Sequence, residues 1–276
     1  MAKVLLVGCG ALGTAIALNL YHAGHEVVGV RKSLKQLPHY MKTIQADVTV
    51  QDALIELVET QPQIVIYCIV ATAQNDESYY LHYVAGLKHV LESQQHNTRL
   101  ERVFFVSSTR VYGKTTDALV DESTSAIATD FGGCRLLEAE QLLTSLKCDY
   151  TILRLSGIYG AGRLSLLNMA KDIQRWPKEN HWSNRIHEED AARFVSYLVD
   201  RHVSNQKLAS CFLVTDDMPT EQYEVLMWLA KQLEVDVESV EVPHVNGGKR
   251  LINNRMREMG FVLMYPTYVQ GYRELL

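Results

Sequence analysis

The sequence has little cysteine and no excess of positive charge. Its five cysteines are odd in number, scattered along the chain and never in a Cys-x-x-Cys pair, which argues against a disulfide framework and a zinc site. Lysine and arginine number 27 against 32 acidic residues, giving a net charge of −5, so the sequence lacks the basic surface typical of nucleic-acid binding. We therefore expect neither a bound metal nor a nucleic-acid partner.

Long hydrophobic runs are also absent. The longest, residues 64–73, has about half of the ~20 residues that a membrane span needs. The amino terminus has a strand-like run that meets glycines at once, without the pattern of a signal peptide. Of the 276 residues, 47% are hydrophobic and 21% charged, as in an ordinary globular protein of one or two domains. We expect a soluble, cytoplasmic protein with no membrane partner.

Short aliphatic runs alternate with longer, helix-like stretches. We predict strands at residues 3–7, 26–30, 43–46, 63–69, 102–107, 150–155 and 211–214. We predict helices at residues 11–22, 51–59, 76–95, 132–146 and 188–201, and a small helical end after residue 220. This repetition predicts an α/β fold with a parallel sheet and helices on both faces. Ligands of such sheets bind outside the carboxyl ends of the strands.

The strongest motif is a Gly-x-Gly-x-x-Gly turn that follows the first predicted strand and opens the first predicted helix. In this context the pattern is typical of dinucleotide binding. The first glycine permits the tight turn, the second lets the backbone approach a pyrophosphate, and the third lets the helix pack on the sheet. Free N–H groups at the helix start then hold the phosphates. The predicted contacts are Gly8, Cys9, Gly10, Ala11, Leu12 and Gly13. The alternative is a glycine-rich turn without a ligand.

The end of the second predicted strand indicates which cofactor is preferred. An NAD enzyme usually has an acidic residue about 20 residues past the glycines, where it binds the ribose hydroxyls. Here that stretch contains Arg31 and Lys32 and no acid. A 2′-phosphate is best bound by a guanidinium. We therefore predict NADP(H) over NAD(H), with Arg31 as the main contact and Lys32 or Ser33 assisting. A solvated basic turn is the alternative.

The ends of the third and fourth predicted strands supply further cofactor contacts. Asp47, followed by Val48, is placed either to accept from the adenine amino group or to cap the next helix. The sequence leaves these two roles equally open. Val70 and Ala71 end the fourth strand, where small residues leave room for the ribose and diphosphate of the cofactor.

Four segments together carry a resemblance to a known family. They are the glycine turn and the sequences Val-Ser-Ser-Thr-Arg-Val-Tyr-Gly (106–113), Leu-Arg-Leu-Ser-Gly-Ile-Tyr-Gly (153–160) and Asn-Arg-Ile-His-Glu-Glu-Asp-Ala (184–191). The chain resembles the extended short-chain dehydrogenase/reductases, the group of NAD-dependent epimerase/dehydratases acting on nucleotide sugars. The resemblance implies a Rossmann-type, doubly wound sheet of about seven strands with a small C-terminal substrate domain. We expect the NADP-binding domain at residues 1–157 and about 187–214, and the substrate lobe at about 158–186 and 215–276.

The same resemblance implies several site residues. Ser108, four residues before the tyrosine of the Val-Tyr-Gly segment, orients the substrate oxygen and is a catalytic candidate. Tyr112 is a second catalytic candidate because it lies nearest in sequence to the predicted site, although the tyrosine of this segment is commonly structural in the family. Cofactor contacts are expected from Leu155, Ser156 and Gly157. Substrate contacts are expected from Ser108, Thr109, Tyr159 and Arg185. The resemblance also implies a homodimer formed through the predicted helices 76–95 and 132–146.

The chain departs from the family at one decisive point. These enzymes usually carry Tyr-x-x-x-Lys, in which the tyrosine is the acid/base and the lysine lowers its pKa. Here one register places Phe131 and Arg135 at these positions, and another places Gly132 and Leu136 there. Neither supplies a tyrosine. The sequence therefore supports two hypotheses: an NAD(P)-dependent oxidoreductase or epimerase with a non-standard proton donor, acting on a nucleotide-sugar-like or small carbonyl substrate, or a catalytically silent NADP(H) sensor on the same fold.

Overall fold

The computed structural model describes residues 1–33, 38–113 and 119–276. The chain divides into two compact units. Unit 1 comprises Met1–Gly113, Ala126–Arg154 and Ala192–Phe212, and unit 2 comprises Lys114–Ser125, Leu155–Ala191 and Leu213–Leu276. Among the described residues, no helix combines the length and hydropathy that crossing a membrane would require. Assignment of the units to cofactor and substrate binding stays a prediction.

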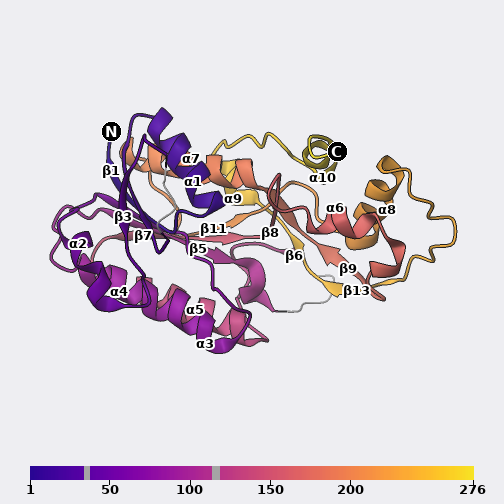
Figure 1. Cartoon of the computed structure of the whole chain (residues 1–276), viewed down its shortest axis with the longest axis horizontal. Coiled ribbons are helices and arrows are strands. Elements are labelled where there is room, and N and C mark those ends of the chain that lie inside the picture. Colours follow the sequence, from indigo (N-terminus) through magenta and orange to yellow (C-terminus); the bar gives the residue numbers. More distant parts are fainter. Residues whose placement is uncertain (34–37, 114–118) are drawn as a thin grey trace. The chain divides into compact units, whose positions relative to one another are not determined.

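Unit 1 is built around a seven-stranded parallel sheet, which confirms the predicted Rossmann-type α/β class (Figure 1). Its strand order is β11-β7-β5-β4-β1-β2-β3. The strands are β1 (Lys3–Val7), β2 (Glu26–Arg31), β3 (Lys42–Gln45), β4 (Ile64–Tyr67), β5 (Arg102–Ser108), β7 (Asp149–Leu155) and β11 (Cys211–Val214). Strand β1 pairs in parallel with both β2 and β4, so the glycine turn that follows β1 lies at the centre of the carboxyl edge.

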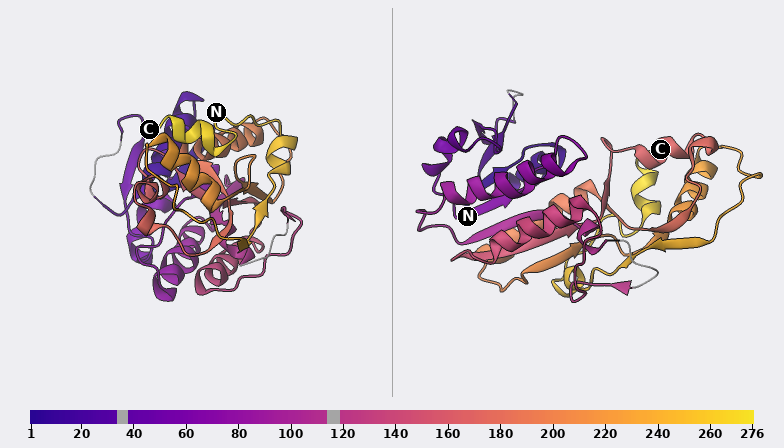
Figure 2. Two further views of the ribbon diagram at one scale, coloured as in Figure 1. Left: turned by 90° about the vertical axis from the view of Figure 1, so that its right-hand side faces the viewer. Right: turned by 90° about the horizontal axis from the view of Figure 1, so that it is seen from below.

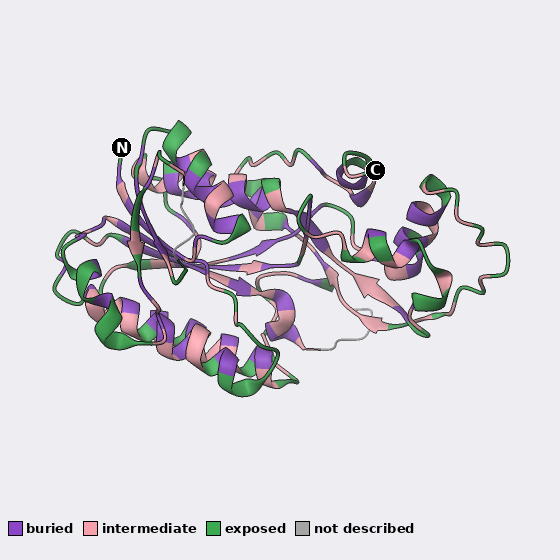
Figure 3. Ribbon diagram, in the orientation of Figure 1, coloured by how far each residue is buried: buried purple, intermediate pink, exposed green. Residues whose placement is uncertain are grey.

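Helices cover both faces of this sheet. Helices α1 (Ala11–His22) and α7 (Glu188–Val203) lie on one face, and α4 (Gly86–Ser93) and α5 (Phe131–Leu143) lie on the other (Figure 1). The central strands are continuous apolar runs because both of their faces are buried (Figure 3). A short 3-10 turn, Gln51–Leu54, leads into α2 (Ile55–Val58). The sheet is thus a rigid platform for the loops at its carboxyl edge.

The prediction of a single helix over residues 76–95 is wrong in detail. This segment consists of α3 (Asp76–Tyr79), a π-helical turn (Tyr80–Ala85) and α4. The Tyr67 hydroxyl donates to the His82 carbonyl within this turn, and a side chain at Gly86 would approach that hydroxyl within 2.6 Å. The Tyr67 hydroxyl therefore occupies the space beside Gly86 and His82, and the chain passes it as a π turn instead of a regular α-helix. The segment runs beside α5 (Figure 2).

Unit 2 has small sheets and a core of its own. Its elements are β6 (Leu119–Val120), β8 (Gly157–Tyr159), α6 (Ser165–Ala170), β9 (Asn180–Ser183), β10 (Arg185–His187), β12 (Thr220–Glu221), α8 (Gln222–Gln232), β13 (Val245–Gly248), β14 (Arg250–Leu251), α9 (Asn254–Glu258) and α10 (Tyr268–Arg273). Strands β8 and β10 pair in parallel, and β9 lies between β12 and β13. The helical end after residue 220 is confirmed, whereas the sequence did not predict the short strands.

Candidate functional site

The glycine turn has a shape that two of its glycines enforce. Gly8 has a φ of +105°, and a side chain there would lie 2.2 Å from the Cys68 carbonyl oxygen. A side chain at Gly13 would lie 2.2 Å from the Gly8 carbonyl oxygen. At Gly10, by contrast, an added Cβ would meet no described atom within 4 Å. The turn is therefore packed against the protein at its two ends and open at its middle, where the first amides of α1 have no partner within the helix.

The other predicted residues of the turn contribute backbone rather than side chains. Leu12 is buried in the core and Ala11 is exposed. The Cys9 thiol lies 3.6 Å from the Leu6 carbonyl oxygen, and burial raises its pKa to about 11. Cys9 is consequently not a nucleophile at neutral pH.

The side chain of Arg31 reaches from the end of β2 to the glycine turn. Its Nη1 donates to the Cys9 carbonyl oxygen at 3.2 Å, and its Nε donates to the Ser33 hydroxyl at 2.6 Å. Both partners are neutral. Among the described residues, no carboxylate forms an ion pair with this guanidinium. Arg31 therefore retains a positive charge beside the turn.

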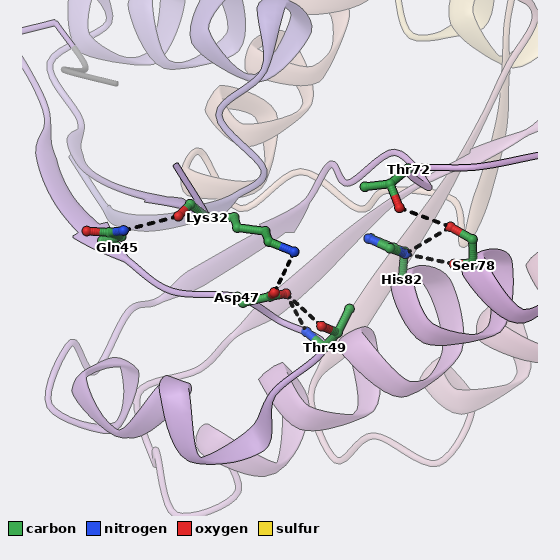
Figure 4. A network of polar contacts seen from close by, with 7 residues as sticks. All are labelled: Lys32, Gln45, Asp47, Thr49, Thr72, Ser78 and His82. Carbon is green, nitrogen blue, oxygen red and sulfur yellow. Dashed lines mark hydrogen bonds and ion pairs between the residues drawn. The ribbon is translucent and has the colours of Figure 1, made fainter. Parts of the chain in front are cut away.

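Lys32 turns instead toward the end of β3 (Figure 4). Its Nζ lies 2.8 Å from Oδ2 of Asp47. The other Asp47 oxygen accepts from the Thr49 amide at 3.0 Å and from its hydroxyl at 2.8 Å. Burial opposes ionisation, but the hydrogen bonds from Lys32 and Thr49 outweigh it and lower the Asp47 pKa. The helix-cap alternative for Asp47 is wrong, because Val50 is the cap residue of the following 3-10 turn; the adenine contact stays a prediction.

The loop after β4 contains both predicted cofactor residues and a polar chain that the sequence did not indicate. Val70 is exposed, and Ala71 is half-buried. Next to them, the Thr72 hydroxyl lies 3.3 Å from that of Ser78, which lies 3.4 Å from Nδ1 of His82 (Figure 4). Val48 is buried on the neighbouring segment. The sequence did not indicate this chain of contacts, because Thr72 lies in the loop before α3 and reaches Ser78 across a turn.

Ser108 ends β5 and shapes the turn that follows it. Its Oγ accepts from the Arg110 amide at 3.2 Å and caps the 3-10 turn Thr109–Tyr112. The hydroxyl hydrogen of Ser108 is thereby left to donate elsewhere. Thr109 is buried.

Tyr112 lies inside the core. It is 2% exposed, and its hydroxyl accepts from Arg154 at 2.8 Å. Arg154 in turn binds both carboxylate oxygens of Glu140, at 3.1 and 2.6 Å, and Glu140 accepts from Ser107 at 2.6 Å. Tyr112 thus belongs to a buried hydrogen-bond network. Its predicted catalytic role has no support in this geometry.

The start of α5 lacks a phenol in either register of the family motif. Phe131 packs edge-on against Tyr79, with ring centroids 5.3 Å apart. Arg135 forms a bidentate pair with Asp76 at 2.8 Å and a second ion pair with Glu138 at 2.7 Å. Gly132 and Leu136, the pair of the alternative register, are buried. The start of α5 therefore offers no phenol as an acid or base.

The predicted residues of unit 2 lie on β8, β10 and the segment before β8. Leu155 and Ser156 are buried, and Gly157 is exposed. Tyr159 stacks on Tyr272, with ring centroids 4.6 Å apart. Arg185 lies over the Tyr268 ring, 5.5 Å from its centroid.

Unit 2 also contains several buried polar atoms without a partner among the described residues. They are Tyr159 Oη, Arg185 Nη1, His187 Nε2, Asp216 Oδ2 and Gln222 Oε1. Burial lowers the pKa of His187 and raises that of Asp216 to about 8. The sequence did not indicate Asp216, because a single acid after a strand has no distinguishing pattern.

Comparisons with known proteins agree with this arrangement. The family model for the NAD dependent epimerase/dehydratase family matches residues 4–209. Protein YeeZ of Escherichia coli is 27% identical over 208 residues, which are 72% of this chain and 73% of that protein. A solved structure from Methylobacillus flagellatus, described as a candidate NAD-dependent epimerase/dehydratase, is 41% identical and covers 99% of this chain and 97% of its own, with a TM-score of 0.90.

More distant structures share the fold. The Bordetella bronchiseptica enzyme WbmG in complex with NAD and UDP has a TM-score of 0.80 at 14% identity, covering 99% of this chain and 93% of its own. UDP-glucose 4-epimerase of Thermotoga maritima with UDP-glucose has a TM-score of 0.78 at 15% identity, covering 99% of both chains.

Proposed function

The chain belongs to the NAD-dependent epimerase/dehydratase family, and we propose on this premise that it transfers hydride between a nicotinamide cofactor and a nucleotide-sugar-like or small carbonyl substrate. The observation that carries the proposal is the glycine turn. It is closed by packing at Gly8 and Gly13 and open at Gly10, where an added Cβ would meet nothing. This is the opening that a diphosphate needs beside the amides of a helix start.

The residues around the turn fit a dinucleotide. Backbone of residues 8–13 would hold the diphosphate, and Asp47 would accept from the adenine amino group. When bound, a nicotinamide dinucleotide supplies the hydride donor or acceptor. Ser108, with a hydrogen to donate at the carboxyl end of β5, would orient the substrate oxygen and stabilise negative charge developing on it.

We propose NADP(H) as the preferred form. Arg31 supports this preference, because its hydrogen-bond partners among the described residues are neutral, which leaves its charge to bind a 2′-phosphate. Lys32 is already paired with Asp47, so its contribution should be the smaller one. Titration of NADPH and NADH against Arg31→Asp is expected to show a greater loss for NADPH. Lys42→Asp, which changes the charge equally at a lysine paired with Glu26, should leave the preference intact. Equal losses for both cofactors with Arg31→Asp would contradict the assignment.

Turnover tests the reaction itself. NADPH oxidation would be measured with a panel of aldehydes, ketones and nucleotide-sugar intermediates, in the wild type and in Ser108→Ala. We expect turnover with at least one substrate class and its loss in Ser108→Ala.

A second function is favoured by one observation: Phe131, the residue at the family's tyrosine position in one register, has no proton to give. Tight NADPH binding without turnover across the panel would support a cofactor-sensing protein instead.

A further inference from the structure

The ring of Phe131 is covered by a phenol and a guanidinium from two other elements of unit 1. Tyr79, the last residue of α3, meets it edge-on at 5.3 Å. Arg110, in the turn after β5, places its guanidinium carbon 4.9 Å from the Phe131 centroid and 5.1 Å from the Tyr79 centroid. A phenol and a cation, the two groups that the family motif would supply from α5, therefore lie beside the start of that helix.

These two groups are also hydrogen-bonded to each other. Arg110 Nη1 donates to the Tyr79 hydroxyl oxygen at 2.9 Å. The Nε of Arg110 is fixed by Asp130, the cap residue of α5, at 2.8 Å. Tyr79 is 7% exposed, and its ring packs against Phe131 and Arg110. The phenol and the guanidinium therefore have little freedom to move apart. Asp130 also forms an ion pair with this guanidinium, so Arg110 acts on the phenol through its directional hydrogen bond, and such a bond is stronger to a phenolate oxygen than to a neutral hydroxyl.

A carbonyl oxygen already binds to this pair. The Gln74 side-chain carbonyl oxygen accepts from the Tyr79 hydroxyl at 3.0 Å and from Arg110 Nη1 at 3.3 Å. Gln74 is exposed, in the loop between β4 and α3. An exposed side chain is easily displaced, whereas the two donors are held in place. The pair is consequently arranged to give two hydrogen bonds to one carbonyl oxygen, as electrostatic stabilisation of a developing oxyanion requires.

Other tyrosines nearby are less suited to the role. The Tyr112 hydroxyl is engaged by Arg154 in the core. Burial raises the pKa of the Tyr83 phenol to about 12. Ser108, in contrast, shares the turn of Arg110 and accepts from its amide. A substrate oxygen at the Gln74 position would therefore meet the Tyr79–Arg110 pair close to the residue that the family uses for orientation.

We propose that Tyr79 is the proton donor that replaces the missing family tyrosine, that Arg110 stabilises its phenolate, and that the Gln74 oxygen marks the place of the substrate carbonyl oxygen. This inference rests on the proposed hydride-transfer function. In reduction, hydride from a reduced nicotinamide adds to the carbonyl carbon and the π electron pair moves to oxygen. That oxygen takes the Tyr79 proton, leaving a phenolate on Arg110 that solvent reprotonates. Oxidation of an alcohol reverses each transfer.

Tyr79→Phe tests the proton donor, because it keeps the ring against Phe131 and removes only the hydroxyl. We expect kcat/KM to fall by about 10²–10⁴-fold, the usual contribution of general acid catalysis, with NADPH affinity unchanged within about twofold. The matched control is Tyr80→Phe. Tyr80 is the next residue, lies under Arg135 at 5.1 Å, and forms no hydrogen bond among the described residues. It should retain wild-type turnover.

The role of Arg110 is tested without turnover, by titrating phenolate absorbance in the cofactor-free protein. Subtracting the Tyr79→Phe signal isolates Tyr79. The midpoint of this difference signal is expected at higher pH in Arg110→Met, which loses the hydrogen bond to the phenol oxygen, than in the wild type, and Arg110→Lys, which retains a charged donor, should reverse most of the change. Circular dichroism and thermal denaturation would establish that each variant folds.

The outcomes separate this inference from the function on which it rests. A wild type that binds NADPH and turns over nothing overturns the proposed function, and the catalytic role of Tyr79 falls with it. A wild type that turns over, together with a Tyr79→Phe variant of equal kcat/KM, overturns the proton donor alone. A Tyr79 pKa that does not rise in Arg110→Met overturns the stabilising role of Arg110, whatever the turnover.

Discussion

Replacing Asp216 with asparagine is expected to stabilise the protein progressively, relative to the wild type, as pH rises from 5 to 8. Asp216 is 1% exposed. One carboxylate oxygen accepts from the Met218 amide at 3.2 Å, and the other has no partner among the described residues. Burial disfavours the charged form and raises the Asp216 pKa to about 8, although the Arg185 guanidinium partly opposes this rise.

The magnitude follows from the difference between the folded and unfolded pKa values. In the unfolded chain Asp216 titrates near its ordinary value of 3.8. Between the two values the folded protein holds a proton that the unfolded chain has released, so the free energy of unfolding falls as pH rises. The stabilisation is complete below about pH 4 and is lost as pH approaches 8. Each pKa unit corresponds to ~1.4 kcal/mol, so a rise of about four units sets an upper bound of about 6 kcal/mol on this contribution.

Urea denaturation of the wild type and Asp216→Asn at pH 5, 6, 7 and 8 measures this effect. The stability difference should shift in favour of the variant by about 1 kcal/mol per pH unit, because asparagine keeps the shape and cannot ionise. Asp217→Asn is the matched control. Its carboxylate is partly exposed and pairs with Arg257 at 2.9 Å, so its replacement changes a surface ion pair instead of a buried carboxyl. A difference between wild type and Asp216→Asn that is constant from pH 5 to 8 would refute the assignment of a buried, protonated Asp216.

Three further outcomes follow from the contacts in unit 1. Gly8→Ala should lower the free energy of unfolding by about 2 kcal/mol or more, because Gly8 has a positive φ and no room for a Cβ. Gly10→Ala should leave the urea denaturation curve unchanged but lower the affinity for a dinucleotide, measured by titration. Iodoacetamide at neutral pH should label exposed Cys134 well before Cys9, whose thiol is buried and has a raised pKa, and mass spectrometry after digestion measures the order. Glu140→Ala should destabilise the protein by about 3–5 kcal/mol, because it leaves a buried guanidinium unpaired, and thermal or urea unfolding checks this.

Much of the fold of unit 1 could be predicted from the sequence because its signals are local. Continuous apolar runs mark strands buried on both faces, and predicted residues 3–7 and 211–214 match β1 and β11. The π turn at Tyr80–Ala85 could not be predicted in this way, since it is linked to a tertiary contact between Tyr67 and the helix. The short strands of unit 2 were not predicted either, because two to four residues carry too little periodicity to be distinguished from loops.

The same distinction between local signals and tertiary contacts applies to the candidate site. The glycine turn was predictable because its chemistry is carried by consecutive residues in one strand-to-helix connection. The distance to the glycines likewise indicates Arg31, and the structure places its guanidinium on the Cys9 carbonyl; its contact with the cofactor stays a prediction. The partners of Lys32 and Asp47 were not predictable, because they join the ends of two strands. For Asp47 the sequence left two roles open, and the structure removed one.

The missing tyrosine shows why absence of a motif is a weak argument for absence of its chemistry. The family pattern is a spacing of four along one helix, which places a phenol and a cation near each other on a single element. Tyr79 and Arg110 are 31 residues apart in the chain, yet their side chains are in hydrogen-bond contact at 2.9 Å. Catalysis depends on the positions of groups in space and not on their order in the sequence. A chain that loses the spacing can therefore retain the pair, and only variants of both residues, measured for turnover and for phenol ionisation, distinguish retained chemistry from a fold that merely binds its cofactor.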